Sequence, residues 1–270
     1  SLKVGYWEKN SQLGINFAQA SFNDAWQGGG VNNIAIGLLY NAYGAKHKGK
    51  GVWSNDLQFQ YGVLRNKGRN AVKSVDRLFF ETKYARSINP KLSWFGSVNF
   101  LTQVAPGYNF DANNGDRLAK ISNFLAPGFL SEGIGLEWKP VKYFAVQLGG
   151  ATIRQTFVVD DTVLPAKFAA GESRYGVAAG KKMLNEAGFQ VVAAFDKDIA
   201  KNLNLKWRYQ AFVAYAPEVK PIDHNINLIA TAKVNKYLNV NFTLIGIYDK
   251  DQADSFQLSQ GLAAGLSFKL

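Results

Sequence analysis

The chain has 270 residues, of which 14% are aromatic, with a formal net charge of +11 and a slightly negative mean hydropathy. It contains no cysteine, which excludes disulfides, thiolate metal sites and a cysteine nucleophile. The absence of any run of about 18 apolar residues excludes a membrane-spanning helix, and the scattered Lys and Arg residues argue against a nucleic-acid partner.

Period-two alternation of apolar and polar residues recurs along the chain and predicts β-strands. In chain order, the predicted strands cover residues 12–20, 31–44, 52–62, 74–86, 91–104, 129–139, 142–159, 182–197, 202–215, 224–235, 237–248 and 260–270. The clearest of them is 202–215, where Leu205 and Trp207 alternate with Lys206 and Arg208. Residues 2–7 or 173–179 could add further strands.

The predicted connections alternate in length, with tight turns after every second strand and longer loops between. Aromatic residues such as Trp94 and Trp138 lie beside the tight turns. An even number of antiparallel strands with short turns at one end and long loops at the other is typical of outer-membrane barrels, and aromatic residues form girdles at their membrane interfaces. We therefore predict an all-β, transmembrane, up-and-down antiparallel barrel of about twelve strands, with short periplasmic turns and longer extracellular loops.

We interpret residues 1–270 as one barrel domain, with 1–11 as a periplasmic lead-in and 105–128 and 160–181 as long extracellular loops. The first residues lack the basic start and apolar core of a signal peptide, so we expect a mature form whose signal peptide has been removed. The predicted location is the bacterial outer membrane, with both termini periplasmic.

Six motifs resemble, in order, a family of Bacteroidota outer-membrane barrels that is catalogued as a domain of unknown function. They are WQGGGVNN at 26–33, WSNDLQFQYG at 53–62, KSVDRL at 73–78, TQVAPGY at 102–108, ISNFLAPGFL at 121–130 and LEWKP at 136–140. The stretch GGATIR at 149–154 departs from the family pattern. The resemblance implies an outer-membrane barrel and no assigned activity.

If the apolar faces point to lipid, the polar faces line the lumen. The charged lumen candidates, which would set selectivity in a channel, are Asp56, Arg77, Glu81, Lys83, Glu137, Lys206 and Arg208. Acids and bases in a narrow barrel are expected to pair, because an unpaired charge in a confined space is costly. Small inward residues such as Ala35, Gly37 and Ala263 would leave room for water or an inserted loop.

The stretch ISNFLAPGFL is too apolar to lie free in water. We expect residues 105–130 to fold across the barrel mouth or pack on its rim, with Phe124, Leu125 and Phe129 buried. These three are the candidates for a loop plug.

The predicted tight turns carry ten positive charges and two negative ones, a net of +8, and include Lys46, Lys48 and Lys50. Attraction to lipid phosphates explains such a rim without any protein partner. The sharper hypothesis is a docking rim for an acidic periplasmic protein.

We predict no catalytic site, no cofactor and no metal. Of the two histidines, His47 lies in a lysine-rich turn, and His224 lacks a recognised nucleophile motif although Ser255 and Ser259 follow it. The run DANNGD at 111–116 lacks the order of a calcium loop.

The favoured function is a non-enzymatic accessory or structural subunit of a larger outer-membrane assembly, with a loop-occluded lumen. A narrow porin-like channel for small polar solutes stays open as the alternative, and an outer-membrane lipid hydrolase is the weaker one. The expected partners are outer-membrane lipids and other outer-membrane or periplasmic proteins, with no nucleic acid.

Overall fold

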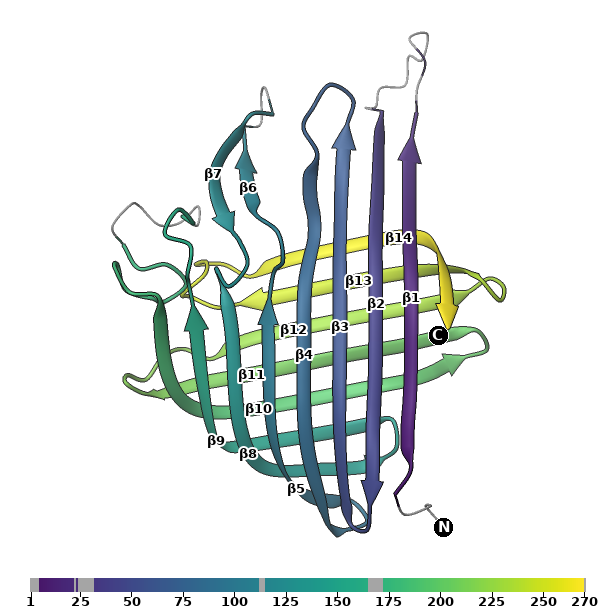
Figure 1. Ribbon diagram of the computed structural model, residues 1–270, viewed down its shortest axis with the longest axis vertical. Helices are drawn as coiled ribbons and strands as arrows, with labels where there is room; N and C mark the ends of the chain where they lie inside the picture. Colours follow the sequence, from purple (N-terminus) through teal and green to yellow (C-terminus); the bar gives the residue numbers. More distant parts are fainter. Residues whose placement is uncertain (1–4, 22, 24–31, 112–114, 165–171, 270) are drawn as a thin grey trace.

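The computed structural model describes residues 5–21, 23, 32–111, 115–164 and 172–269 (Figure 1). Twelve of the strands in these ranges form a closed antiparallel barrel. They are β1 Trp7–Ala20, β2 Asn33–Lys48, β3 Gly51–Asn66, β4 Val72–Asn89, β5 Leu92–Thr102, β8 Gly128–Val141, β9 Phe144–Phe157, β10 Met183–Ala200, β11 Leu203–Ala216, β12 Asp223–Lys233, β13 Leu238–Tyr248 and β14 Gln257–Lys269. Each strand pairs with its neighbours in chain order, and β1 closes the barrel on β14.

The outer surface of the barrel is apolar around its circumference. Large apolar side chains exposed on the strands include Ile15, Ile36, Phe80, Val98, Ile134, Leu148, Ile153, Phe189 and Leu262. Buried Gln, Asn, Glu and Arg side chains lie on the opposite faces of the same strands. In lipid, every backbone polar group needs a partner within the protein, so a closed barrel with an apolar exterior is built to span a bilayer. The predicted fold class is confirmed.

Aromatic side chains gather at the short-turn end. Trp7 contacts Trp53 at 6.1 Å between ring centroids, and Phe195 stacks on Trp207 at 5.9 Å. The ammonium of Lys197 stands 4.3 Å from the ring centroid of Tyr143. This arrangement of aromatic rings and neighbouring lysines is the composition expected at a membrane–water interface.

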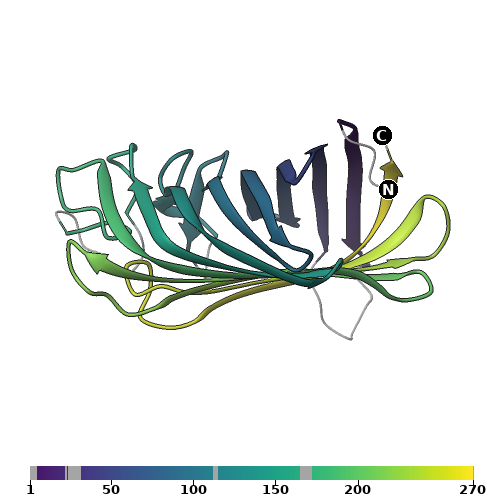
Figure 2. The ribbon, with the colours of Figure 1, turned by 90° about the horizontal axis from the view of Figure 1, so that it is seen from below.

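Short turns join the strands at one end of the barrel, and longer segments join them at the other, as predicted (Figure 1). The short turn between β2 and β3 contains Gly49 with a φ of +57°, a conformation that favours glycine. Seen from below, the first strands lie along one side of the barrel and the last strands along the other (Figure 2).

The structure differs from the predicted elements in three places. β1 begins at Trp7, so residues 7–11 belong to the barrel wall rather than to a lead-in. The loop between β5 and β8 contains a short hairpin, β6 Gly107–Phe110 and β7 Arg117–Ser122, which stands apart from the barrel sheet (Figure 1). Residues 173–179 form no barrel strand and carry an isolated bridge, whereas residues 2–4 lie outside the described ranges.

Within the described ranges there is no helix with the length and apolar character needed to cross a bilayer.

Candidate functional site: the barrel interior

Polar side chains on the inner faces of the barrel strands are largely buried. Gln60 is 2% exposed and Glu186 is 1% exposed, and Gln58, Asn99, Gln147, Gln190 and Asn241 are also buried. A twelve-stranded barrel is intermediate between filled eight-stranded barrels and porins with an aqueous channel. The burial of these inward side chains is therefore the property that separates a filled lumen from an open one.

The first charged group, which we call the Arg154 group, lies toward the long-loop end. The Arg154 guanidinium on β9 contacts Glu186 at 2.8 Å and Asp223 at 2.6 Å. Lys220 contacts Glu186 at 3.0 Å and Asp251 at 2.8 Å. The Arg154–Asp223 contact joins β9 to β12, which are not neighbours, so this group ties strands together across the lumen.

The aromatic ring of Phe212 lies beneath the Arg154 guanidinium, 4.1 Å from its central carbon. Burial alone would lower the pKa of Lys220, but the hydrogen bonds with Asp251 and Glu186 raise the pKa above its ordinary value. The acids that Lys220 contacts therefore favour its charged form.

The second group, the Arg77 group, lies deeper. Arg208 on β11 donates to Glu81 on β4 at 2.9 Å, another contact across the lumen. Arg77 donates to the side-chain oxygen of Gln58 at 2.9 Å, and Gln58 donates to Asp56 at 2.8 Å. The two guanidiniums both stand near the ring of Phe79, at 4.8 and 5.3 Å from its centroid.

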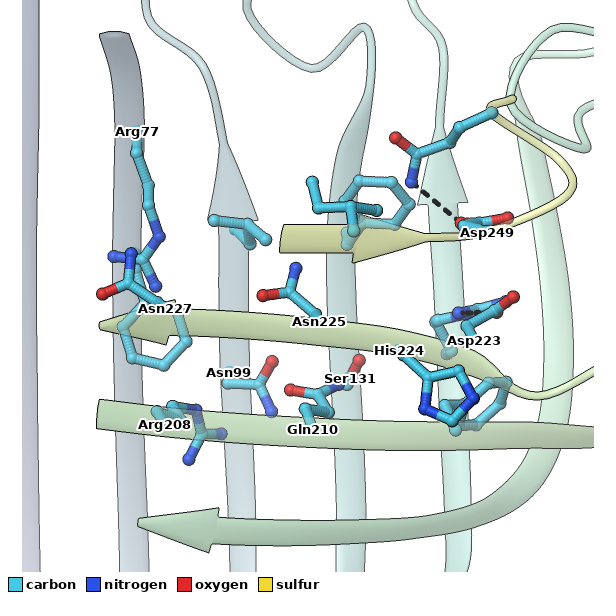
Figure 3. Close-up of a pocket in the computed structure, with 17 residues that line it drawn as sticks. Arg77, Asn99, Ser131, Arg208, Gln210, Asp223, His224, Asn225, Asn227 and Asp249 are labelled. Carbon is cyan, nitrogen blue, oxygen red and sulfur yellow. Dashed lines mark hydrogen bonds and ion pairs between the residues drawn. The ribbon is translucent and has the colours of Figure 1, made fainter. Parts of the chain in front are cut away.

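A cavity of about 80 Å³ lies between the two charged groups (Figure 3). Its lining includes Arg77, Arg154, Arg208, Asn99 and Asn227. A space of this size holds a few water molecules that can bridge the polar groups around it.

Uncharged side chains hydrogen-bond to one another in the part of the lumen next to β1 and β14. Asn241 on β13 donates to Asn16 on β1 at 3.3 Å and to Asn239 at 2.9 Å, and Gln12 donates to Ser267 at 2.6 Å. We call this set, with Gln58 and Gln60, the amide tier.

Two predicted lumen pairs lie toward the short-turn end. Lys83 forms an ion pair with Glu137, which also accepts a hydrogen bond from Gln147 at 2.9 Å. Lys206 lies 4.0 Å from Asp196, and both side chains are exposed, so this pair stands at the mouth. All seven predicted lumen residues thus lie in the interior or at its mouth, and each has a polar partner.

A vestibule of about 750 Å³ opens above the interior at the long-loop end. Lys73, in the motif KSVDRL, stabilises the wall of the vestibule. Its ammonium contacts Asp76 at 2.9 Å. It also donates hydrogen bonds to the side chain of Gln103, in the motif TQVAPGY, and to the Ala105 carbonyl, both at 2.7 Å. Asp76 in turn accepts the backbone N–H groups of Val104 and Ala105 at 2.9 Å. Two of the motifs noted in the sequence therefore fix the base of the β6–β7 hairpin.

The apolar stretch ISNFLAPGFL packs on the rim. Its Ala126 is fully buried against Val158, Val163 and Val177 from the segment after β9. The Leu125 N–H donates to the hydroxyl of Thr102 at 3.0 Å, which anchors the turn to the end of β5. The segment after β9 therefore covers part of this stretch, which explains why the stretch can be apolar.

The expected burial of all three plug residues is corrected by the structure. Phe124 is 47% exposed, and Leu125 is partly buried in the rim. Phe129 lies on β8 and lines the interior cavity. The residue at the centre of the rim cluster is the small Ala126, because the turn points its methyl group at the three valines and leaves the Phe124 ring outside.

Asp160 stabilises the same rim. Its carboxylate accepts hydrogen bonds from Asn123 at 2.6 Å, Lys120 at 3.0 Å and the Thr162 hydroxyl at 2.6 Å. The hydrogen bond from Thr162, together with those from Asn123 and Lys120, holds the pKa of Asp160 well below its ordinary value. The charged form of Asp160 thus links the two loops that meet at Ala126.

The three rim lysines, Lys46, Lys48 and Lys50, are exposed at the turn between β2 and β3. The ammonium of Lys46 stands 5.8 Å from the ring centroid of Trp7 in the aromatic girdle. Their positions match the predicted basic rim at the short-turn end.

Both histidines lie beside tyrosine rings. His224 Nδ1 lies 2.6 Å from the Tyr209 hydroxyl, and its ring lies among those of Tyr209 and Tyr248. His47 stacks on Tyr6 at 4.9 Å. Among the described residues, no group of three or more His, Asp or Glu side chains is placed to hold a metal ion.

The sequence reasoning missed Arg154, Glu186, Asp223 and Lys220. A β-bulge in β9 lies between Gln147 and Thr152, since Gly149 pairs with Gln190 while Thr152 pairs with Gly188. The bulge shifts the side-chain alternation by one residue, so Arg154 points inward against the pattern set by the first half of the strand.

With the interior described, the chain can be compared with known proteins. Residues 17–108 match the model of a family described as "Protein of unknown function (DUF3078)". This confirms the resemblance to a family of unknown function. The matched stretch runs from β1 to β6 and includes both Lys73 and Gln103 at the base of the vestibule. A search of curated proteins finds no match.

Solved barrels resemble the chain in outline. The NanC porin has 10% identity and a TM-score of 0.40, covering 97% of this chain and 100% of its own. The translocator domain of the autotransporter NalP from Neisseria meningitidis has 10% identity and a TM-score of 0.36, covering 98% and 88%. The Pseudomonas putida toluene transporter TodX has 7% identity and a TM-score of 0.35, covering 100% and 89%. Likeness at this level does not carry a function from one barrel to another.

Proposed function

We propose that this outer-membrane barrel is a non-conducting accessory or structural subunit of a larger outer-membrane assembly. The observation that carries this proposal is the burial of the inward polar side chains, with Gln60 at 2% and Asn241 at 6% exposure. In a water-filled bore, such side chains would be exposed to solvent. The occlusion comes from side chains of the wall, and the long loop lies on the rim.

Ion pairs that cross the lumen make the barrel rigid. Arg208–Glu81 and Arg154–Asp223 each join strands that are not neighbours. Removing one partner of a buried pair is strongly unfavourable, so these contacts resist opening of the bore. In a barrel whose lumen is closed in this way, the loops, the outer wall and the basic rim are the surfaces that can bind other subunits.

Planar-bilayer recordings test the sealed lumen. We expect the wild-type barrel to show no conductance steps, and a variant lacking residues 107–120 of the β6–β7 hairpin to stay silent as well. Conductance that appears after the deletion would identify the hairpin as a plug. Steady wild-type conductance whose ion selectivity changes in Arg208→Glu would favour the alternative, a narrow channel for small polar solutes.

The accessory role is tested at the basic rim. We expect Lys46→Glu/Lys48→Glu/Lys50→Glu to reduce co-purifying protein roughly tenfold, because three reversed contacts each change the attraction by several tenths of a kcal/mol or more. Affinity purification from native membranes, quantified by mass spectrometry, measures this loss.

The matched control is Lys181→Glu/Lys182→Glu at the long-loop end, which should retain the complex. Equal recovery from the rim variant and the wild type would leave only attraction to lipid phosphates as the role of the rim.

A further inference from the structure

The seam between β1 and β14 closes over only part of its length. Their pairing runs from Gln12↔Lys269 to Phe17↔Ala264 in the part of the chain that the structure describes. β14 continues toward the long-loop end as far as Gln257 and remains paired with β13 there. β1 likewise continues to Ala20, paired with β2. Among the described residues, 18–20 of β1 and 261–263 of β14 therefore present unpaired edges to each other.

A cavity of about 220 Å³ lies at this opening. It is lined by exposed outer-wall residues, among them Phe17 and Leu262, and by residues of the inner face, among them Ala35 and Thr243. Because its lining includes both faces of β1 and β14, the cavity reaches into the gap between these two strands. None of the residues that line it is charged.

The opening joins the vestibule. Ser74, Val75, Ile245 and Ser259 line both spaces. Below them, the hydrogen bond between Asn241 and Asn16 belongs to the amide tier that closes the lumen. For a molecule in the vestibule, the amide tier therefore blocks the path down the lumen, whereas the gap between β1 and β14 offers a lateral path into the membrane.

We propose that this opening is a lateral portal for the acyl chain of a single-chain amphiphile, which moves between the vestibule and the outer leaflet of the membrane. Unpaired backbone groups are tolerated at membrane depth where they line a cavity. The uncharged lining and the outward Phe17 and Leu262 suit an acyl chain. Arg117 in the vestibule wall, 5.0 Å from the ring centroid of Tyr108, offers a positive charge to an anionic head group.

Photo-crosslinking with palmitate that carries a diazirine near its methyl end tests the portal in proteoliposomes. We expect labelled peptides to include the inner-face residues Thr243 and Ser259 as well as the lipid-facing Leu262. Because the chain has no cysteine, Ala18→Cys/Ala263→Cys extends the seam by one residue pair when it is oxidised to a disulfide. The control is Ile15→Cys/Leu266→Cys, a pair within the existing ladder.

Closing the seam should lower inner-face labelling at least roughly tenfold, the loss expected when about two methylene groups can no longer be buried. Reduction should restore it, and labelling of lipid-facing residues should persist throughout. If the disulfide variant does not fold, Ala263→Trp fills the opening and should give the same loss. Unchanged inner-face labelling after closure would overturn the portal. So would a wild type labelled on its outer face alone, as when a partner strand occupies the gap. The sealed lumen is tested separately by conductance.

Discussion

Arg154→Ala is expected to destabilise the barrel by about 3 kcal/mol, at the lower end of the cost of breaking a buried ion pair. The change leaves Glu186, whose side chain has no exposed surface, and Asp223 without the guanidinium that both contact. Lys220 still contacts Glu186 at 3.0 Å, so part of the buried negative charge stays compensated. The free energy of unfolding from urea titration in detergent micelles measures the loss.

Lys206→Ala is the matched control, because the Lys206–Asp196 pair is exposed and separated by 4.0 Å. Pairs of this kind contribute about 1 kcal/mol or less. Arg154→Met/Glu186→Leu removes both charges and should recover part of the stability lost in Arg154→Ala. Equal losses in Arg154→Ala and Lys206→Ala would contradict a structural role for the Arg154 group.

The barrel itself could be predicted because most of its strands keep a strict alternation. In β11, Lys206 and Arg208 follow the polar face, and Trp207 follows the apolar face without interruption. This alternation alone places Arg77, Glu81 and Arg208 in the interior. It cannot say which of them meet, because Glu81 and Arg208 lie on strands β4 and β11, which contact each other only across the lumen.

The strand over β9 is predicted, but the inward direction of Arg154 in its second half is not, for a local reason. A methyl group on Gly135 of the neighbouring strand would collide with the Leu148 carbonyl oxygen, so the bulge depends on a glycine opposite it. Nothing in the alternation of GGATIR reveals that shift, and Arg154 was therefore assigned to no site. The pattern that departs most from the family resemblance is the one that turns the main lumen arginine inward.

At the rim, composition predicts that a stretch is buried but not which of its residues is buried. Hydrophobicity predicts that ISNFLAPGFL is covered, and Ala126 is indeed buried. Which residue is covered depends on the turn, where Leu125 has a φ of 53° and its N–H is held by Thr102. In this turn the small Ala126 side chain points into the rim cluster, and the larger Phe124 side chain stays exposed. The size and hydrophobicity of Phe124 therefore do not identify the buried residue.

Removing the amide tier should make the barrel, which we propose is non-conducting, conduct ions. In Gln58→Ala/Gln60→Ala/Asn241→Ala, three buried amides are lost, and the space that they leave is bordered by polar groups such as Asn16 and Asn239. Water enters cavities that offer polar partners, so the space is expected to fill and to join the vestibule to the short-turn mouth. Single-barrel recordings should change from no steps to steady steps.

The control, Asp196→Ala/Asn204→Ala/Lys206→Ala, removes the same number of polar side chains at the mouth, where Asp196 and Lys206 are already exposed. It should remain silent. If the amide variant is folded, as judged by its resistance to unfolding in sodium dodecyl sulfate, and is still silent, the seal must lie in the charged groups. In that case Arg208→Ala/Glu81→Ala, which removes the contact between β4 and β11, should open the bore. A barrel that stays silent after both changes would mean that the wall strands, rather than the side chains inside them, close the lumen.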